Sequence, residues 1–134
     1  RIQFTLRHAS RQTVPVLPCL RDIWHDHLLF EGDELTGLVD FGAMRVDTVA
    51  ADLSRLLSSL FPSNSSQWDP ALSLYEKVRP LTDSELNLIP ILAESGTLLS
   101  GTHWLRTRYV DRAEFDMSRV CDRLETIVAR VEST

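Results

Sequence analysis

The stretch CLRDIWHDHLLFEGDELTGLVDFG, residues 19–42, has the pattern that decides the fold. Two short apolar runs, residues 27–31 and 35–39, are separated by a polar segment that contains Gly32 and Asp33. This pattern is typical of a β-hairpin whose loop is longer than two residues. We therefore expect two antiparallel strands here, with one loop of the chain before the first strand and one after the second.

Two aspartates occupy those loops. Asp22 lies in a polar, aromatic-flanked segment before the first apolar run, and Asp40-Phe41-Gly42 directly follows the second. Because the strands of a hairpin are antiparallel, we expect the two loops to lie side by side. One carboxylate can hold a divalent metal through hard oxygen ligands. The other can orient a hydroxyl group and accept its proton. The sequence therefore predicts a cleft served by two carboxylates.

The order of these residues resembles the aminoglycoside phosphotransferase and choline/homoserine kinase-like family, which has a protein-kinase-like fold. In that family the loop reads H-G-D-x-x-x-x-N-x-L-F and precedes a hairpin, a G-x-x-D-F motif and a helix that contains D-L. The matching residues here are Asp22, His27, Leu29-Phe30, Gly37, Asp40-Phe41 and Asp52-Leu53. The match covers about residues 19–57. Leu20 stands where the family has His, and His27 stands where it has Asn.

The resemblance implies a role for each matching polar residue. Asp22 would be the catalytic residue that positions the acceptor hydroxyl, and Asp40 would bind the Mg²⁺ that bridges the phosphates of ATP. His27 would occupy the second metal or phosphate position, although imidazole suits softer metals than Mg²⁺. Asp52 would brace the catalytic loop through its backbone. Arg21 would contact either a phosphate of the nucleotide or a neighbouring acid.

Two other functions stay open on the same residues. His25 and His27, together with Asp22 and Asp26, allow a dedicated metal site with hydrolytic chemistry. Alternatively, Leu20 and His27 mark lost chemistry, and the domain is a non-catalytic relative that binds a ligand or partner.

The rest of the chain is predicted to be mostly helical. Apolar residues recur at helical spacing from Asp47, which we expect to cap that helix. Further helices are predicted over about 68–79, after a capping box at 82–85, and over about 115–131. The third of these four is apolar on several sides and is expected to be central and buried, with a kink or break at Pro90.

Two weaker signals precede the hairpin. Residues 1–12 have the apolar spacing of a helix. Residues 14–20 favour a strand, which must be short or lie at an edge because it contains two prolines. The fold class is therefore α+β with helices in the majority. We expect one domain over 1–134, with a catalytic and metal-loop region at 1–46 and a helical body at 47–134.

The resemblance further implies that this domain is the C-terminal lobe of the kinase-like fold. The family's nucleotide lobe precedes the catalytic loop and supplies a phosphate-covering loop and a lysine. Only 21 residues precede Asp22, no glycine-rich loop is present, and the one lysine, Lys77, follows Asp40. We therefore expect the N-terminal nucleotide lobe to be absent and the isolated chain to be an incomplete, inactive enzyme.

Composition narrows the function classes. The 134 residues are 43% hydrophobic and 25% charged, as in globular proteins, and the net charge is −5. This charge disfavours nucleic acid as a partner and slightly favours a cationic acceptor. No membrane span is expected. Cys19 and Cys121 form no CxxC pair, which is typical of a reducing compartment such as the cytoplasm.

The resemblance therefore implies a small-molecule kinase with ATP and Mg²⁺ as cofactors and a small-molecule hydroxyl compound as substrate. The sequence leaves the acceptor open among aminoglycosides, choline-like compounds, homoserine-like compounds and sugars.

Overall fold

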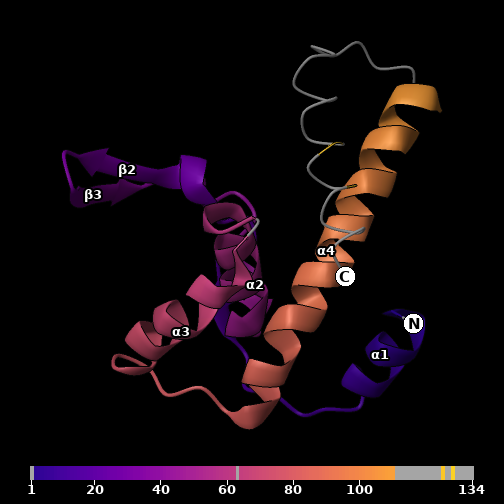
Figure 1. Ribbon diagram of the computed structural model, residues 1–134, viewed down its shortest axis with the longest axis horizontal. Helices are drawn as coiled ribbons and strands as arrows, with labels where there is room; N and C mark the ends of the chain where they lie inside the picture. Colours follow the sequence, from indigo (N-terminus) through magenta and orange to yellow (C-terminus); the bar gives the residue numbers. More distant parts are fainter. Residues whose placement is uncertain (1, 63, 111–124, 126–127, 129–134) are drawn as a thin grey trace. The chain divides into compact units, whose positions relative to one another are not determined.

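The computed structural model describes residues 2–62, 64–110, 125 and 128. The chain divides into two units, Arg1–Ala93 and Glu94–Thr134. All the strands that the structure describes belong to the first unit, and helices predominate in the chain (Figure 1). The prediction of an α+β protein with helices in the majority is confirmed. None of the described helices is long and apolar enough to cross a membrane.

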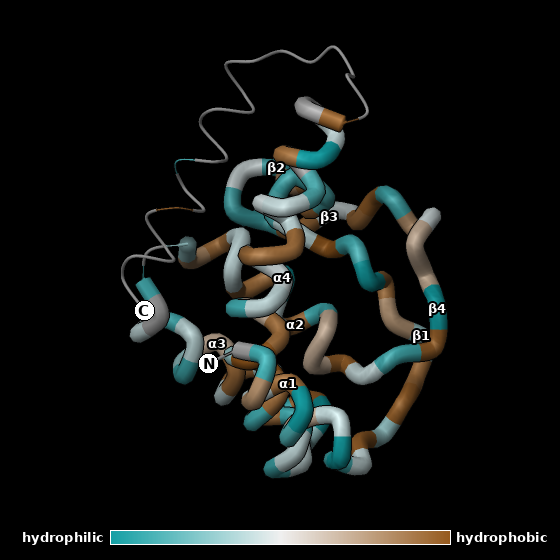
Figure 2. The backbone as a smooth tube through the Cα atoms, turned by 90° about the vertical axis from the view of Figure 1, so that its right-hand side faces the viewer, coloured by the Kyte–Doolittle hydropathy of each residue, from teal (hydrophilic) through white to brown (hydrophobic). Residues whose placement is uncertain are grey.

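Four strands form two antiparallel pairs. Strand β1 (Leu17–Cys19) pairs with β4 (Arg45–Asp47), and the two run side by side in Figure 2. Strand β2 (Leu28–Glu31) pairs with β3 (Glu34–Leu38) to form the hairpin expected from the sequence. Gly32 in its turn has a φ of 60°, a left-handed conformation that glycine adopts without steric cost. The strand predicted within residues 14–20 is present and, as expected from its prolines, only three residues long.

The hairpin is inserted between the strands of the other pair. From β1 the chain passes through residues 20–27 into β2, and from β3 it passes through residues 39–44 into β4. The two connecting segments meet at the base of the hairpin, where the Val39 amide donates a hydrogen bond to the His27 carbonyl at 3.1 Å. The hairpin itself extends away from the helices (Figure 1). The predicted proximity of the two loops is therefore confirmed.

Helix α2 (Val49–Leu60) begins one residue later than a cap at Asp47 would require. Its N-cap is Thr48, whose hydroxyl oxygen accepts a hydrogen bond from the Ala50 amide at 3.4 Å. The prediction that Asp47 caps this helix is wrong. The Asp47 carboxylate instead accepts the Thr48 amide at 2.8 Å and pairs with a basic residue of the preceding loop, Arg21.

Helix α2 supplies much of the core. Val49, Ala50, Leu53 and Leu57 are buried along one face, which confirms most of the predicted stripe. Leu60, at the end of the stripe, is exposed.

Three other helices contribute to the first unit. The C-terminal residue of α1 (Ile2–Ala9) is buried in the core, and α3 (Trp68–Glu76) packs partly buried hydrophobic side chains against it. Leu88 and Ile89, near the start of α4 (Asp83–Tyr109), are also buried there.

Helix α4 departs from its prediction in two respects. It continues through Pro90, so the predicted break is absent. Pro90 is exposed, and its nitrogen cannot donate the helical hydrogen bond of that position. The helix is also not buried throughout, because Leu99 is 68% exposed. The helix predicted over about 115–131 lies outside the described residues, apart from positions 125 and 128.

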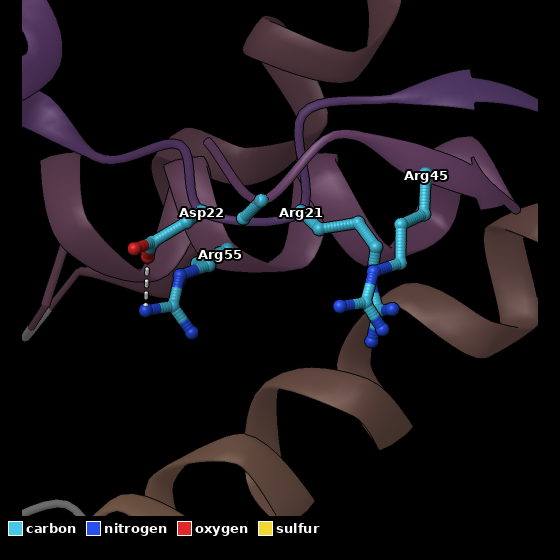
Figure 3. Close-up of a pocket in the computed structure, with 5 residues that line it drawn as sticks. Arg21, Asp22, Arg45 and Arg55 are labelled. Atoms are coloured by element: carbon cyan, nitrogen blue, oxygen red, sulfur yellow. Dashed lines mark ion pairs between the residues drawn. The ribbon is translucent and has the colours of Figure 1, made fainter. Parts of the chain in front are cut away.

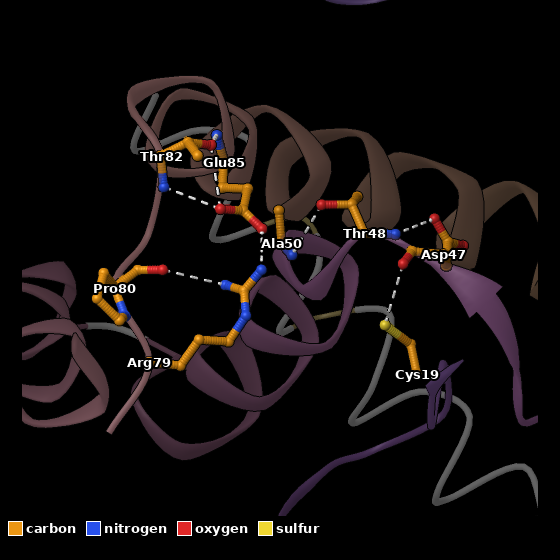
Figure 4. A network of polar contacts seen from close by, with 8 residues as sticks. All are labelled: Cys19, Asp47, Thr48, Ala50, Arg79, Pro80, Thr82 and Glu85. Atoms are coloured by element: carbon orange, nitrogen blue, oxygen red, sulfur yellow. Dashed lines mark hydrogen bonds and ion pairs between the residues drawn. The ribbon is translucent and has the colours of Figure 1, made fainter. Parts of the chain in front are cut away.

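A buried carboxylate fixes the start of α4. The Glu85 side chain is 0% exposed and accepts hydrogen bonds from the Thr82 amide at 2.8 Å and from Arg79 Nη2 at 2.7 Å (Figure 4). The Glu85 amide in turn donates to the Thr82 hydroxyl oxygen at 3.2 Å, which completes the predicted capping box. Burial acts to raise the pKa of Glu85, but the hydrogen bonds from Arg79 and Thr82 outweigh it and lower the pKa.

Glu85→Ala is expected to lower the free energy of unfolding by about 3 kcal/mol, because it removes one partner of an enclosed ion pair and an acceptor of the helix cap. Chemical denaturation monitored by circular dichroism measures the change. Glu34→Ala, at an exposed position of the hairpin, is the control and should alter stability by less than about 0.5 kcal/mol. Equal effects of the two substitutions would contradict this assignment.

The contribution of Glu85 should also depend on pH. Because its folded-state pKa lies below the ordinary value of 4.5, the unfolded chain takes up the proton first as the pH falls. The stabilisation is therefore complete above about pH 4.5 and is lost as the pH falls through the folded-state pKa. The difference in Tm between the unsubstituted protein and Glu85→Gln should shrink between pH 6 and pH 3. A constant difference would contradict the prediction.

Candidate functional site

The loop that follows β1 is held by a carboxylate of helix α2. Asp52 accepts hydrogen bonds from the backbone amides of Leu20, at 2.8 Å, and Arg21, at 2.6 Å. Hydrogen bonds to a charged acceptor are among the stronger ones in proteins. The bracing contact that the resemblance implied for Asp52 is therefore present.

Two residues of the site have left-handed backbone conformations. Arg21 has a φ of 63° and Asp40 a φ of 64°. For residues other than glycine this conformation costs about 1–2 kcal/mol. At Arg21 the contacts with Asp52 and a 3.1 Å ion pair between its Nε and Asp47 Oδ2 hold the backbone in place. Such strain is common at functional sites, where the surrounding structure maintains it.

Helix α2 contacts this loop through one polar face. Asp52, Arg55 and Ser59 are spaced three and four residues apart, so they lie on the same side of the helix. Arg55 Nη2 lies 2.5 Å from Asp22 Oδ1, and the Ser59 hydroxyl oxygen accepts the His25 amide at 3.0 Å. The face therefore follows the loop from its first residue to the short 3₁₀ helix η1 (His25–His27).

His27 connects the two loops. Its Nδ1 lies 2.7 Å from the Asp22 carbonyl oxygen, and the Trp24 indole Nε1 donates a hydrogen bond to its Nε2 at 3.0 Å. A neutral ring with the proton on Nδ1 satisfies both contacts. The same Nε2 lies 3.8 Å from Asp40 Oδ2. The ring therefore holds the backbone of Asp22 and lies near the carboxylate of Asp40 without a hydrogen bond to it, and its side chain is 15% exposed.

A pocket of about 330 Å³ opens beside Asp22 (Figure 3). It is lined by Arg21, Asp22, Ala43, Arg45 and Arg55. The three arginines come from the loop, from β4 and from α2, so the pocket depends on the pairing of β1 with β4 and on the packing of the helix beneath them.

The predicted site residues are brought together to different degrees. Contacts of His27 link Asp22 and Asp40, as described above, and Arg21 lies at the pocket beside Asp22. His25 instead pairs with Asp26, with His25 Nε2 3.1 Å from Asp26 Oδ1, at an exposed position. In the described part of the chain, no group of three or more His, Cys, Asp or Glu side chains could hold a metal ion. The alternative of a His/Asp metal site therefore gains no support.

Arg45 and Arg55 also belong to the site, although the sequence motif does not include them. Arg55 follows Asp52 by one helical turn, a spacing that would have placed it on the loop side of α2. Arg45 has no comparable signal, because its position at the pocket depends on the register in which it opposes Cys19.

The residues present fit a divalent cation at Asp40 better than at His27. The Asp40 carboxylate is 57% exposed, and carboxylate oxygens are the ligands that Mg²⁺ prefers. The Nε2 lone pair of His27 already accepts the Trp24 N–H and would have to give up that hydrogen bond to bind a metal. The structure does not test the predicted metal role of His27, but these contacts favour a positioning role.

Comparisons with known proteins agree with the motif. The profile of the "Phosphotransferase enzyme family" matches residues 3–84. The chain is 35% identical over 82 residues to a homoserine kinase of Agrobacterium fabrum, covering 58% of this chain and 26% of that protein. It is 36% identical over 95 residues to a homoserine kinase of Methylobacterium radiotolerans, and the match covers 67% of this chain and 28% of that protein. The chain thus spans about a quarter of the length of these relatives. No solved structure matches it.

Asp52→Asn is expected to destabilise the loop, because an amide group offers only one acceptor oxygen to the two backbone amides. The free energy of unfolding should fall by about 2 kcal/mol, and the amide NMR signals of Leu20 and Arg21 should shift and lose protection from hydrogen exchange. Asp33→Asn, in the exposed hairpin turn, is the matched control. Unchanged protection of the two loop amides would contradict the bracing role.

Proposed function

The chain belongs to the phosphotransferase enzyme family, and from this premise we propose that the protein containing it transfers the γ-phosphoryl group of ATP to a hydroxyl group of a small molecule. We propose further that residues 1–134 correspond to the C-terminal lobe of a kinase-like fold. The nucleotide-gripping part then belongs to the remaining length that the relatives have and this chain does not cover.

The proximity of the Asp22 and Asp40 loops on either side of His27 is the observation that supports the proposal. His27 contacts the backbone of Asp22 at 2.7 Å and approaches the carboxylate of Asp40 at 3.8 Å. Phosphoryl transfer depends on positioning and charge neutralisation more than on covalent participation by the protein. The closeness of the loop that carries Asp22 to the loop that carries Asp40 serves this requirement.

Asp22 acts on the acceptor. Its carboxylate would accept a hydrogen bond from the acceptor hydroxyl, orient the oxygen toward the γ-phosphorus and receive the proton as the new P–O bond forms and the bond from that phosphorus to ADP breaks. The ion pair of its Oδ1 with Arg55 fixes the rotation of the carboxylate and leaves Oδ2 for the substrate. The Asp52 contacts hold the backbone that presents it.

Asp40 holds Mg²⁺, which supplies charge neutralisation on the phosphates of ATP. The Gly42 amide donates a 3.4 Å hydrogen bond to Asp40 Oδ1, which helps to set the orientation of this carboxylate. His27 is a positioning residue that keeps the two loops in register. Of the two roles left open for Arg21, the contact with a neighbouring acid is supported by its ion pair with Asp47, and Arg21 also lines the pocket beside Asp22.

The acceptor is a small molecule with a hydroxyl group. Homoserine is one compound to test, because relatives that match residues of this chain are named homoserine kinases. The pocket volume of about 330 Å³ is at the lower end of the range of about 300–1,000 Å³ for small-molecule sites.

Asp22→Asn, introduced into the complete protein, is expected to lower kcat by about 10²–10⁴-fold, because the amide cannot accept the proton of the hydroxyl. The KM for ATP should change little. Phosphate transfer from ATP to a panel of hydroxyl compounds, with Mg²⁺ present, measures both parameters. Asp33→Asn provides a control of the same chemistry at an exposed turn and should retain full activity.

Turnover that Asp22→Asn leaves unchanged would overturn the role of Asp22. The unsubstituted complete protein could also bind an acceptor-like ligand but neither bind MgATP nor transfer phosphate. That result would contradict the phosphotransferase proposal and support a non-catalytic binding domain.

A further inference from the structure

The pocket beside Asp22 has a local charge opposite to that of the whole chain. The net charge of the chain is −5, yet three of the five residues that line this pocket are arginines and only one is acidic. In the view of Figure 3 the guanidinium groups of Arg21 and Arg45 overlap, and that of Arg55 points toward Asp22. Local charge, more than net charge, decides which ligands a pocket of this size attracts.

The ion pairs around the pocket leave one arginine uncompensated. Arg21 pairs with Asp47, and Arg55 pairs with Asp22. Arg45 takes part in no ion pair with any residue that the structure describes. Because a guanidinium group carries five N–H donors, Arg45 and the unused donors of Arg55 can bind a group with two acceptor oxygens.

The pocket lies on the acceptor side of the site. Asp22, which orients the hydroxyl under the proposed function, is among its lining residues, whereas Asp40 and His27 are not. A ligand anion held by Arg45 therefore lies beside the carboxylate that activates the acceptor and apart from the carboxylate that holds the metal and nucleotide. A nucleotide phosphate would be expected at Asp40 instead.

We propose that Arg45, with Arg55, forms an anion subsite that selects acceptors bearing a carboxylate or phosphate group in addition to the hydroxyl that is phosphorylated. This inference rests on the proposed function, because it places the acceptor hydroxyl at Asp22. The subsite anchors the anion, and the remainder of the small pocket leaves the hydroxyl within reach of Asp22. A cationic acceptor is disfavoured by the same arginines.

The test compares acceptors that differ only in charge. All acceptors are assayed with the complete protein at saturating MgATP. Each hydroxy carboxylate is compared with its uncharged amide. Each hydroxyl-bearing phosphate ester is compared with the corresponding neutral alcohol. The unsubstituted protein should favour the charged member of a pair in kcat/KM. Arg45→Gln should reduce that preference by about tenfold, the loss expected for one charge-assisted hydrogen bond. Arg45→Lys should restore part of it, and the stronger of the two charged series identifies the anion.

Arg11→Gln is the matched control. It removes the same charge at an exposed position outside the pocket and should leave the preference unchanged. Ionic strength is held constant, because salt screens exposed charges.

A binding measurement separates the two proposals. The Nε–H NMR signals of the pocket arginines are followed while acetate or inorganic phosphate is added to the otherwise unsubstituted protein without ATP, so that no turnover occurs and the Asp22–Arg55 ion pair is kept. Saturable shifts that Arg45→Gln abolishes and Arg11→Gln retains support the anion subsite. If they occur although the unsubstituted protein phosphorylates no acceptor, the subsite stands and the phosphotransfer proposal fails.

Two outcomes overturn the inference while leaving phosphotransfer intact. In the first, charged and uncharged acceptors are used equally, and Arg45→Gln alters neither. In the second, Arg45→Gln raises the KM for ATP and leaves the acceptor preference unchanged. This result would mean that the pocket binds the nucleotide and not the acceptor.

Discussion

The Asp52 carboxylate, which accepts the backbone amides of Leu20 and Arg21, is the contact on which the site depends. It ties the loop after β1 to helix α2, whose opposite face is buried in the core through Leu53 and Leu57. The position of the loop is therefore set by the packing of the helix. Without this anchor, the left-handed backbone at Arg21 would relax and the orientation of the following residue, Asp22, would be lost.

Helix α2 extends the same principle along its length. Arg55 and Ser59 follow Asp52 on one face and contact Asp22 and the His25 amide, so one face of a single helix fixes successive parts of the loop. The apolar face stabilises the unit, and the polar face positions the residues that chemistry requires. His27 links this loop to the second one, because its ring contacts the Asp22 carbonyl and its own carbonyl accepts the Val39 amide.

The polar networks of the first unit have different tasks. Glu85 satisfies the start of α4 and Arg79 in a fully enclosed position, so its effect is on stability. The arginines at the pocket are partly exposed, with side chains of Arg21 and Arg55 that are 43% and 51% accessible, and such ion pairs contribute little to stability. Their arrangement instead creates a positive potential in a chain that is acidic as a whole.

The sequence by itself determined the hairpin, the helical stripe and capping box, and the loops that hold Asp22 and Asp40, because local spacing and turn chemistry encode these features. It misplaced the helix cap at Asp47, because Asp47 and Thr48 are both capping residue types and only the ion pair with Arg21 decides between them. The pocket was decided by tertiary structure alone. Arg45 and Arg55 come from different elements, and strand register and helix packing, which bring together residues distant in the chain, have no local signature.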